Sequence, residues 1–312
     1  MKQELMACHE RIKPYIHNTP IMESGHIENF LGSDLYFKCE NFQRAGAFKM
    51  RGAINSVLQL SDEQREKGVI THSSGNFAQA LALACRYLNV KCYVVMPHDA
   101  PAVKRNAVMV YGGDIHECSP TMESRERVSK QIMDETGATF IHPSNDMNVI
   151  LGQGTATMEF LEDHPDLDVI ITPVGGGGLI AGTSLAAKHF GKEGIVVIGG
   201  EPLEADDAFR SLASGHIEGN LTINTIADGL RTQLGDITFP IIKDNVESIV
   251  RVRENEIISA MRVIWERMKI IVEPSSAVAL AVLIKERPQF SGKKVGIILT
   301  GGNVDLDNLP FD

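Results

Sequence analysis

The sequence predicts an α/β protein made of two doubly wound parallel-sheet domains, with a ligand cleft between them. Short β-branched runs alternate with amphipathic segments of helical length along nearly the whole chain, and this alternation is typical of parallel sheets covered by helices. Glycine-rich stretches follow several runs, where a strand would pass into a helix. In open parallel sheets, such turns lie at the carboxyl ends of the strands, where ligands bind.

The expected strands are runs rich in Val, Ile and aromatic residues: Asp34–Cys39, Val69–Ser73, Lys91–Met96, Asp114–Glu117, Val169–Pro173, Gly194–Gly199, Ser248–Val252 and Lys294–Thr300. The expected helices have apolar residues at the helical period: Arg51–Leu60, Phe77–Leu88, Ala102–Tyr111, Met122–Thr136, Gly152–Leu161, Leu179–His189, Glu254–Lys269 and Ser276–Lys285. We expect residues 68–145 to form a small domain, and residues 1–67 and 146–312 to form a large one.

Charge and cysteine usage restrict the class of protein. A formal net charge of −10 argues against nucleic acid or an anionic membrane surface as the main partner. No apolar stretch reaches transmembrane length, and the first residues lack a signal-peptide core. The five cysteines are scattered without metal-ligand spacing, which predicts reduced thiols in a cytoplasmic protein.

Lys49 stands between Phe48 and Met50, just ahead of a helical pattern. Burial there would lower the pKa of its amine, and a partly desolvated lysine is the group that forms a Schiff base with an aldehyde cofactor. Taken alone, a lysine near a helix start is usually a solvated surface residue. The glycine-rich elements further along the chain make Lys49 a candidate for chemistry.

Four consecutive glycines, Gly175–Gly178, follow an apolar strand and open a helix. Several backbone N–H groups can converge there, and the helix N-terminus adds partial positive charge, so the loop suits a phosphate. The alternative is a tight strand–helix turn. The glycines are contiguous rather than spaced as G-x-G-x-x-G, which favours a phosphate monoester over a dinucleotide.

Two further polar loops also follow strands. Ser73-Ser-Gly-Asn76 offers hydroxyls and backbone N–H groups that suit a carboxylate, although the same residues are also typical of a helix cap. Thr300-Gly-Gly-Asn303 follows the last strand. We expect all three loops and Lys49 to converge on one sheet edge.

In these motifs, and along nearly its whole length, the chain resembles the fold-type II pyridoxal-phosphate enzymes (the tryptophan synthase β-like fold). Within that family it is most similar to the branch of serine racemases and serine, threonine and hydroxyaspartate dehydratases. The matching segments are Gly46-Ala-Phe-Lys-Met-Arg-Gly-Ala53, Ser73–Asn76, Gly175–Gly178, Glu201-Pro202, Ala205-Asp-Asp207, Ile226-Ala-Asp-Gly229, Val272-Glu-Pro274 and Thr300–Asn303.

The resemblance implies pyridoxal 5′-phosphate, held by Lys49 in the large domain at the cleft. It implies a phosphate cradle formed by Gly175, Gly176, Gly177, Gly178 and Leu179, and further cofactor contacts from Phe48, Asn76, Gly229, Glu273 and Thr300. Asn76 would meet the ring hydroxyl and Thr300 the pyridine nitrogen. A hydroxyl at that nitrogen need not protonate the ring, which favours β-elimination over a long-lived carbanion.

The resemblance also implies the substrate contacts. Ser74 would act on the face opposite Lys49, and the loop Ser73, Ser74, Gly75 and Asn76 would bind the amino-acid carboxylate. His72, Arg125 and Thr232 match positions near the substrate side chain. Arg125 could pair with a second carboxylate, or be a solvated residue at a helix start.

The expected reaction is therefore β-elimination of a hydroxy amino acid to a 2-keto acid and ammonia, together with serine racemase activity. Hydroxyaspartate dehydration, or racemisation of aspartate or serine, is the first alternative. A non-catalytic module that binds amino acids on the same fold is the alternative from another class.

Glu201, Ala205 and Asp207 form the last candidate site. Two carboxylates and a backbone oxygen could bind a hard cation, and the resemblance implies Mg²⁺ (or Mn²⁺ or Ca²⁺). The alternative is that Glu201 and Asp207 cap the following helix. The resemblance further implies a homodimer, and it leaves activation by nucleotides open.

Overall fold

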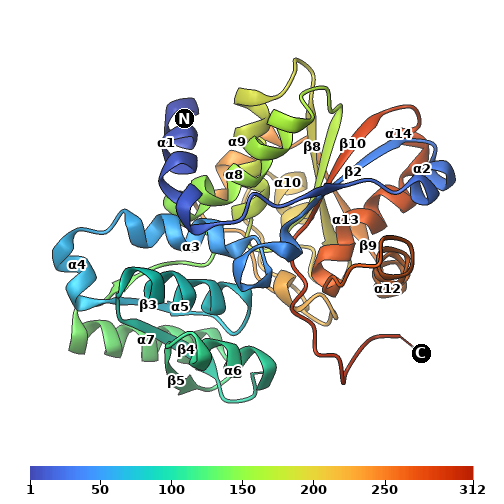
Figure 1. Ribbon diagram of the computed structural model, residues 1–312. Helices are drawn as coiled ribbons and strands as arrows, with labels where there is room; N and C mark the ends of the chain where they lie inside the picture. The colour runs from blue at the N-terminus through green and yellow to red at the C-terminus, as the bar shows by residue number, and fades with distance from the viewer. Residues whose placement is uncertain (101, 312) are drawn as a thin grey trace.

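The computed structural model describes residues 1–100 and 102–311, and these form two α/β domains, each around its own sheet (Figure 1). The larger sheet has the strand order β1-β2-β10-β7-β8-β9, in which only β1 runs antiparallel. The smaller sheet has the order β5-β4-β3-β6 and is wholly parallel. The predicted fold class is confirmed.

The strands of the larger sheet are β1 (Ile21–Met22), β2 (Asp34–Cys39), β7 (Val169–Pro173), β8 (Val196–Pro202), β9 (Ser248–Val252) and β10 (Lys294–Leu299). Those of the smaller sheet are β3 (Val69–His72), β4 (Cys92–Pro97), β5 (Asp114–Cys118) and β6 (Thr139–Phe140). Buried strands such as β7 read as continuous apolar runs because helices cover both faces.

The α-helices of the described residues are α1 (Lys2–Ile12), α2 (Gly25–Leu31), α3 (Lys49–Leu58), α4 (Asp62–Lys67), α5 (Asn76–Leu88), α6 (Ala102–Val110), α7 (Met122–Thr136), α8 (Met147–Asp163), α9 (Gly178–Phe190), α10 (Asp207–Ser214), α11 (Thr238–Asn245), α12 (Glu254–Val263), α13 (Pro274–Lys285) and α14 (Arg287–Phe290). The residues at the N-terminus explain where several of these helices begin. Asp146 caps α8 by accepting hydrogen bonds from two backbone N–H groups, and Pro274 occupies the first turn of α13, where no donor is needed.

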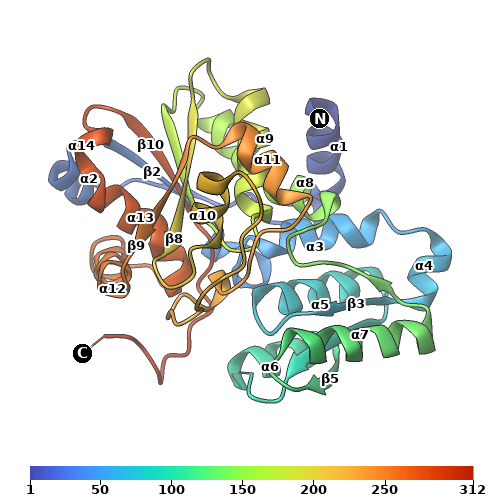
Figure 2. The same ribbon diagram turned by 180° about the vertical axis from the view of Figure 1, so that it is seen from behind.

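Two apolar cores cover the two faces of the larger sheet. Alternate residues of β10 point to opposite sides, so that Ile298 packs with α8 and α9 while Ile297 packs with α12 and α13. The first of these cores continues through α3 into α5 of the small domain, where Ile54 and Leu81 belong to the same cluster. Figures 1 and 2 both show α3 between the two sheets.

Helices α3 and α8 approach closely at paired glycines. A Cβ atom on Gly152 would lie 2.5 Å from the Cα atom of Gly52, a distance that no side chain tolerates. The contact presses the helix that begins with Lys49 against the larger domain.

The structure corrects some of the expected elements. Strand β8 runs on to Pro202, so Glu201 lies within it rather than after it. The expected helix Glu254–Lys269 ends as α12 at Val263 and continues as one π-helical turn, Ile264–Met268. The sequence reading missed α1, α2, α4, α10, α11, α14, β1 and β6, most of which are too short to show a clear period.

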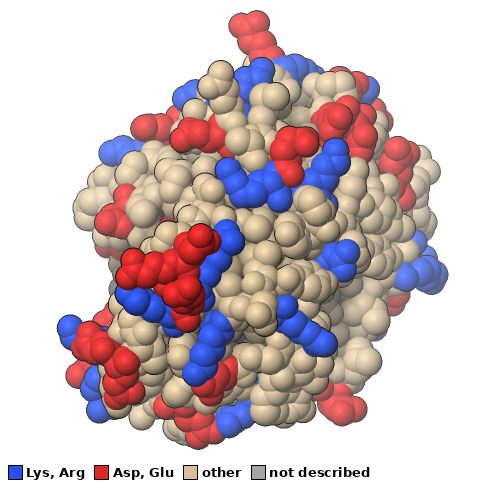
Figure 3. All heavy atoms as spheres, turned by 60° about the vertical axis from the view of Figure 1, so that its left-hand side comes forward, with Lys and Arg blue, Asp and Glu red and all other residues tan. Residues whose placement is uncertain are grey.

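Charged side chains of both signs are interspersed over the face drawn in Figure 3. Within the described part of the chain, the helices are all too short or too polar to cross a membrane.

Candidate active site

Three loops and one helix end meet between the two sheets. The Gly175–Gly178 loop follows β7 and the Thr300–Asn303 segment follows β10, both in the larger sheet. The Ser73–Asn76 loop follows β3, which belongs to the smaller sheet. The expectation that all three share one sheet edge is therefore wrong, because a strand–helix pattern does not encode which sheet a strand joins.

Lys49 is the first residue of α3, and its side chain is half-buried. Its amine donates a hydrogen bond to the carbonyl oxygen of Pro143 at 2.8 Å and lies 4.9 Å and 5.8 Å from the ring centres of Phe48 and Phe77. Desolvation lowers the pKa of this amine to about 8, although the charge of Glu273 opposes the shift. The other buried lysines, Lys38 and Lys104, pair with carboxylates instead.

The glycine loop packs closely against neighbouring side chains, which leave little room for a Cβ atom. A Cβ on Gly176 would lie 2.2 Å from the Ser144 hydroxyl oxygen, and one on Gly175 would lie 3.0 Å from the Thr232 hydroxyl oxygen. Gly177 has φ +82°, a left-handed conformation that glycine adopts without strain. The loop leads directly into α9, with Leu179 buried in its first turn, so its backbone N–H groups and the helix N-terminus can face an anion.

The segment His142–Asn145 joins the lysine to this loop. Pro143 accepts the Lys49 hydrogen bond, and the next residue, Ser144, lies against Gly176. His142 accepts hydrogen bonds from two backbone N–H groups through Nδ1, and desolvation lowers its pKa to about 4. Sequence reasoning missed this segment, since nothing in it resembles a ligand-binding motif.

A carboxylate and two amides meet at the far side of the site. Asn76 Nδ2 donates to Glu273 Oε1 at 2.7 Å, and Asn76 Oδ1 accepts from Asn303 Nδ2 at 2.9 Å. Burial raises the pKa of Glu273 to about 7, and the charge of Asp228 contributes. Glu273 Oε2 has no hydrogen-bond partner among the described residues.

Thr300 and Gly229 are held by serines of α13. The Thr300 backbone N–H donates to Ser276 Oγ at 2.9 Å, and the Gly229 N–H donates to Ser275 Oγ at 3.0 Å. Thr300 is buried, directly after β10.

The predicted substrate residues lie mostly on the small domain. Ser73, Ser74 and Gly75 are half-buried between β3 and α5, and a Cβ on Gly75 would meet no atom within 4 Å, so this loop borders open space. The His72 ring lies 5.1 Å from the Phe140 ring. Desolvation lowers the pKa of His72, and the Arg125 charge adds to the effect.

Comparison with known proteins agrees with this geometry. Residues 12–301 match the family described as "Pyridoxal-phosphate dependent enzyme". The chain belongs to that family.

Its relatives are similar over their full length. Serine racemase of Dictyostelium discoideum is 50% identical over 98% of this chain and 96% of its own. The β-hydroxyaspartate dehydratase of Paracoccus denitrificans is 47% identical over 99% of this chain and 98% of its own. The solved structure of maize serine racemase superposes with a TM-score of 0.95 at 46% identity, covering 98% of this chain and 94% of that one.

The site fits the cofactor that gives the pyridoxal-phosphate family its name. The Lys49 amine has a lowered pKa and is hydrogen-bonded to Pro143, and the glycine loop beside the next residue, Ser144, has no room for a Cβ on Gly176 or Gly177. Asn76 is hydrogen-bonded to Glu273, and the backbone oxygen of Thr300 accepts from the N–H of Phe48, the residue before Lys49, at 3.0 Å.

The acidic cluster lies at the start of α10. Glu201 accepts hydrogen bonds from the backbone N–H groups of Ala208 and Phe209, so it caps this helix as the alternative interpretation expected. Asp207 Oδ2 accepts from Leu234 N, and Oδ1 has no partner in the described residues. Burial and the neighbouring Asp207 raise the pKa of Glu201 well above its usual range, and burial raises the pKa of Asp207 to about 6.

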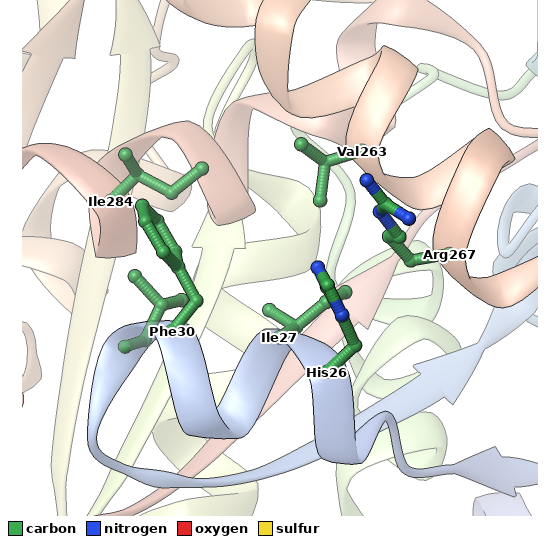
Figure 4. A pocket seen from close by; sticks show the side chains of 7 residues that line it. His26, Ile27, Phe30, Val263, Arg267 and Ile284 are labelled. Carbon is green, nitrogen blue, oxygen red and sulfur yellow. The ribbon is translucent and has the colours of Figure 1, made fainter.

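An apolar pocket lies elsewhere, between α2 and the helices α12 and α13 (Figure 4). Phe30 and Ile27 form one wall, and Val263, Ile284 and Arg267 form the other. It contains none of the residues expected to carry chemistry.

Proposed function

We propose that this chain dehydrates a β-hydroxy amino acid of the serine or threonine type to a 2-keto acid and ammonia, and that it also racemises serine. The amino acid loses its α-proton and its β-hydroxyl as water, and hydrolysis of the enamine releases ammonia, so atoms balance. The observation that carries the proposal is the Lys49 amine, whose pKa desolvation lowers to about 8 and which is hydrogen-bonded to Pro143, the neighbour of the Ser144 that packs against the glycine loop.

Pyridoxal 5′-phosphate, when bound, would supply the electron sink that stabilises the charge left by the α-proton. Lys49 would hold the cofactor and then accept that proton, because an amine with a pKa of about 8 is neutral in a far larger fraction of molecules at physiological pH than an ordinary lysine. Gly175–Gly178 and Leu179 would bind the phosphate group. Phe48, Asn76, Gly229, Glu273 and Thr300 would orient the ring.

The Ser73–Asn76 loop would bind the substrate carboxylate through its hydroxyls and backbone N–H groups. We assign Ser74 as the proton donor on the face opposite Lys49, which separates racemisation from elimination. Elimination needs only the lysine and a leaving hydroxyl. Racemisation needs an acid or base on each face of the substrate's α-carbon, because the proton leaves from one face and returns on the other.

The decisive experiment is a substrate panel on the purified protein with bound cofactor. L- and D-serine, L-threonine and both hydroxyaspartate diastereomers are supplied, and keto acid, ammonia and the opposite enantiomer are measured. Borohydride reduction followed by peptide mass analysis should place the cofactor on Lys49. Binding of amino acids without any keto acid or enantiomer would support the non-catalytic module and overturn the proposal.

Hydroxyaspartate dehydration is the second candidate, and Arg125 favours it. Arg125 Nε is buried without a hydrogen-bond partner among the described residues, close enough to His72 for its charge to lower the pKa of that ring. Such a guanidinium suits a second carboxylate. An Arg125→Gln variant should lose hydroxyaspartate turnover far more than serine turnover if this pairing is made. His72 and Thr232 are the other proposed side-chain contacts.

We further propose that Glu201, Asp207 and the Ala205 backbone oxygen bind Mg²⁺ or a similar divalent cation. Two neighbouring buried carboxylates with raised pKa values are stabilised by a positive ion, and Asp207 Oδ1 is free to ligate. A rise in melting temperature with added Mg²⁺, absent in Asp207→Asn, would support the site.

The remaining parts of the proposal concern organisation. We propose a large cofactor-binding domain of residues 1–67 and 146–312, a small domain of residues 68–145, a cytoplasmic homodimer and a response to nucleotides. The apolar pocket of Figure 4 supports the dimer, since Phe30 leaves 59% of its surface exposed there. Light scattering tests the assembly, and turnover measured with and without nucleotide tests the activation.

A further inference from the structure

Asn303 joins three segments that meet at the site, and none of the roles proposed so far uses it. Both hydrogens of its side-chain amide are engaged: Nδ2 donates to the Ala45 carbonyl oxygen and to Asn76 Oδ1, each at 2.9 Å. Ala45 lies in the loop before Lys49, and Asn76 ends the Ser73–Asn76 loop of the smaller sheet. One side chain therefore bridges a loop of each sheet.

Backbone hydrogen bonds join the segment before Lys49 to the segment that follows β10. Phe48 N donates to Thr300 O, and Gly302 N donates to Gly46 O, each at 3.0 Å. The Asn303 side chain closes this short ladder at its end. It fits so tightly that a Cβ on Gly46 would lie 2.4 Å from Asn303 Oδ1. Ala45 and Gly46 both have positive φ, at 58° and 69°, so the loop needs contacts that hold a conformation unfavourable for Ala45.

The hydrogen bonds fix the orientation of two amides in turn. The Ala45 carbonyl can only accept, so Asn303 must turn its NH₂ group toward it. The second N–H of that group then meets Asn76, which must present its oxygen. The Asn76 NH₂ group is thereby directed at Glu273 Oε1. The second hydrogen of that group makes no hydrogen bond with the described residues, and the proposed function assigns it to the cofactor's ring hydroxyl.

We propose that Asn303 is a positioning residue that fixes Asn76 as a hydrogen-bond donor to the cofactor's ring hydroxyl and ties the lysine-bearing loop to the small domain. The assignment to the ring rests on the proposed function. The link that Asn303 makes between the Ala45 loop and the Ser73–Asn76 loop does not rest on the proposed function, because it consists of hydrogen bonds within the chain.

A double-mutant cycle on cofactor affinity tests the action through Asn76. Asn303→Ala should weaken binding of pyridoxal phosphate to the apoprotein roughly tenfold, as expected for two lost buried hydrogen bonds. The same substitution made in an Asn76→Ala background should weaken it only about threefold, because the hydrogen bond to Asn76 is already gone and only the one to Ala45 is lost. An equal loss in both backgrounds, or no loss in the first, overturns the proposal.

Hydrogen exchange on the apoprotein gives a readout that needs neither cofactor nor substrate. In Asn303→Ala, residues 44–49 and 73–77 should exchange roughly tenfold faster while the β5–α7 loop is unchanged. Asn303→Asp keeps the shape of the side chain and removes both N–H donors. It replaces the alanine variant in this test if that variant fails to fold. Asn308→Asp is the matched control, because it makes the same change at an exposed position five residues further along the segment and should alter nothing. Unchanged exchange in both segments overturns the tie. A wild-type protein without turnover would refute the proposed function and leave this result standing.

Discussion

Arg51 lies two residues after Lys49 and is wholly buried between two carboxylates. Its guanidinium forms paired hydrogen bonds of 2.8 Å to Glu40 and of 2.8 Å and 2.7 Å to Glu159. Lys38 also pairs with Glu159, at 2.8 Å. Although burial alone would raise it, the Arg51 charge holds the pKa of Glu159 well below its usual range. We predict that Arg51→Met is severely destabilising, because Glu40 would keep only the hydroxyl of Thr19 as a partner.

The expected loss follows from the number of charges left behind. Removing one member of a buried ion pair costs about 3–5 kcal/mol, and here one carboxylate loses its only cation while the other keeps Lys38. We therefore expect about 4 kcal/mol at pH 8, a large fraction of a typical domain's stability. The Arg51 charge holds the pKa of Glu159 below its unfolded value, so this part of the wild-type stability is fully present at neutral pH and is lost as the pH falls below about 4.5.

The deficit of the variant relative to wild type should accordingly be smaller at pH 4 than at pH 8. Urea unfolding followed by circular dichroism at both pH values measures it. Lys67→Met is the matched control, since it breaks the exposed pair of Lys67 with Glu63 and should cost less than about 1 kcal/mol. A deficit below about 1 kcal/mol, or one that does not change with pH, would refute the reasoning.

Four further predictions concern the site. The rate at which the apoprotein takes up pyridoxal phosphate should rise from pH 7 to 9 with a midpoint near 8, because only the neutral Lys49 amine attacks an aldehyde; a midpoint above pH 10, read from the growth of the visible absorption band, would contradict the lowered pKa. Gly176→Ala should weaken cofactor binding by at least about tenfold, since its Cβ would lie 2.2 Å from Ser144 Oγ, and equilibrium dialysis would detect unchanged affinity if the loop has room to spare. Ser74→Ala should abolish racemisation of serine while keeping most keto-acid formation, and equal losses of both would remove its assigned role. Asp207→Asn should abolish the stabilisation by Mg²⁺ in thermal unfolding, whereas a retained shift would place the ion elsewhere.

The parts of the site that depend on one short segment could be predicted from the sequence. Residue type and position relative to a strand single out Lys49 and Gly175–Gly178 in the sequence, and the structure links them through Pro143 and Ser144, while their roles stay predictions. The elements with a strong period, such as Met122–Thr136, were predicted to the residue.

The parts that depend on tertiary contacts could not be predicted in this way. Pro143 contributes only a backbone carbonyl, and any residue type supplies one. Asn303 is informative only because Ala45 and Asn76, distant in the sequence, meet at its amide. The assignment of β3 to a separate sheet likewise follows from hydrogen bonds between strands, which no local pattern encodes.

The apolar core that runs from α8 through α3 into α5 makes the two sheets one cooperative unit. Separating them would expose side chains such as Ile54 and Leu81, which are fully buried, at about 25 cal/mol for each Å² of apolar surface. A wide clamshell opening is therefore unfavourable, and motion between the sheets is restricted to small sliding of packed helices. Lys49 is the first residue of the helix that would slide, so any such shift displaces the amine to which we assign the reaction.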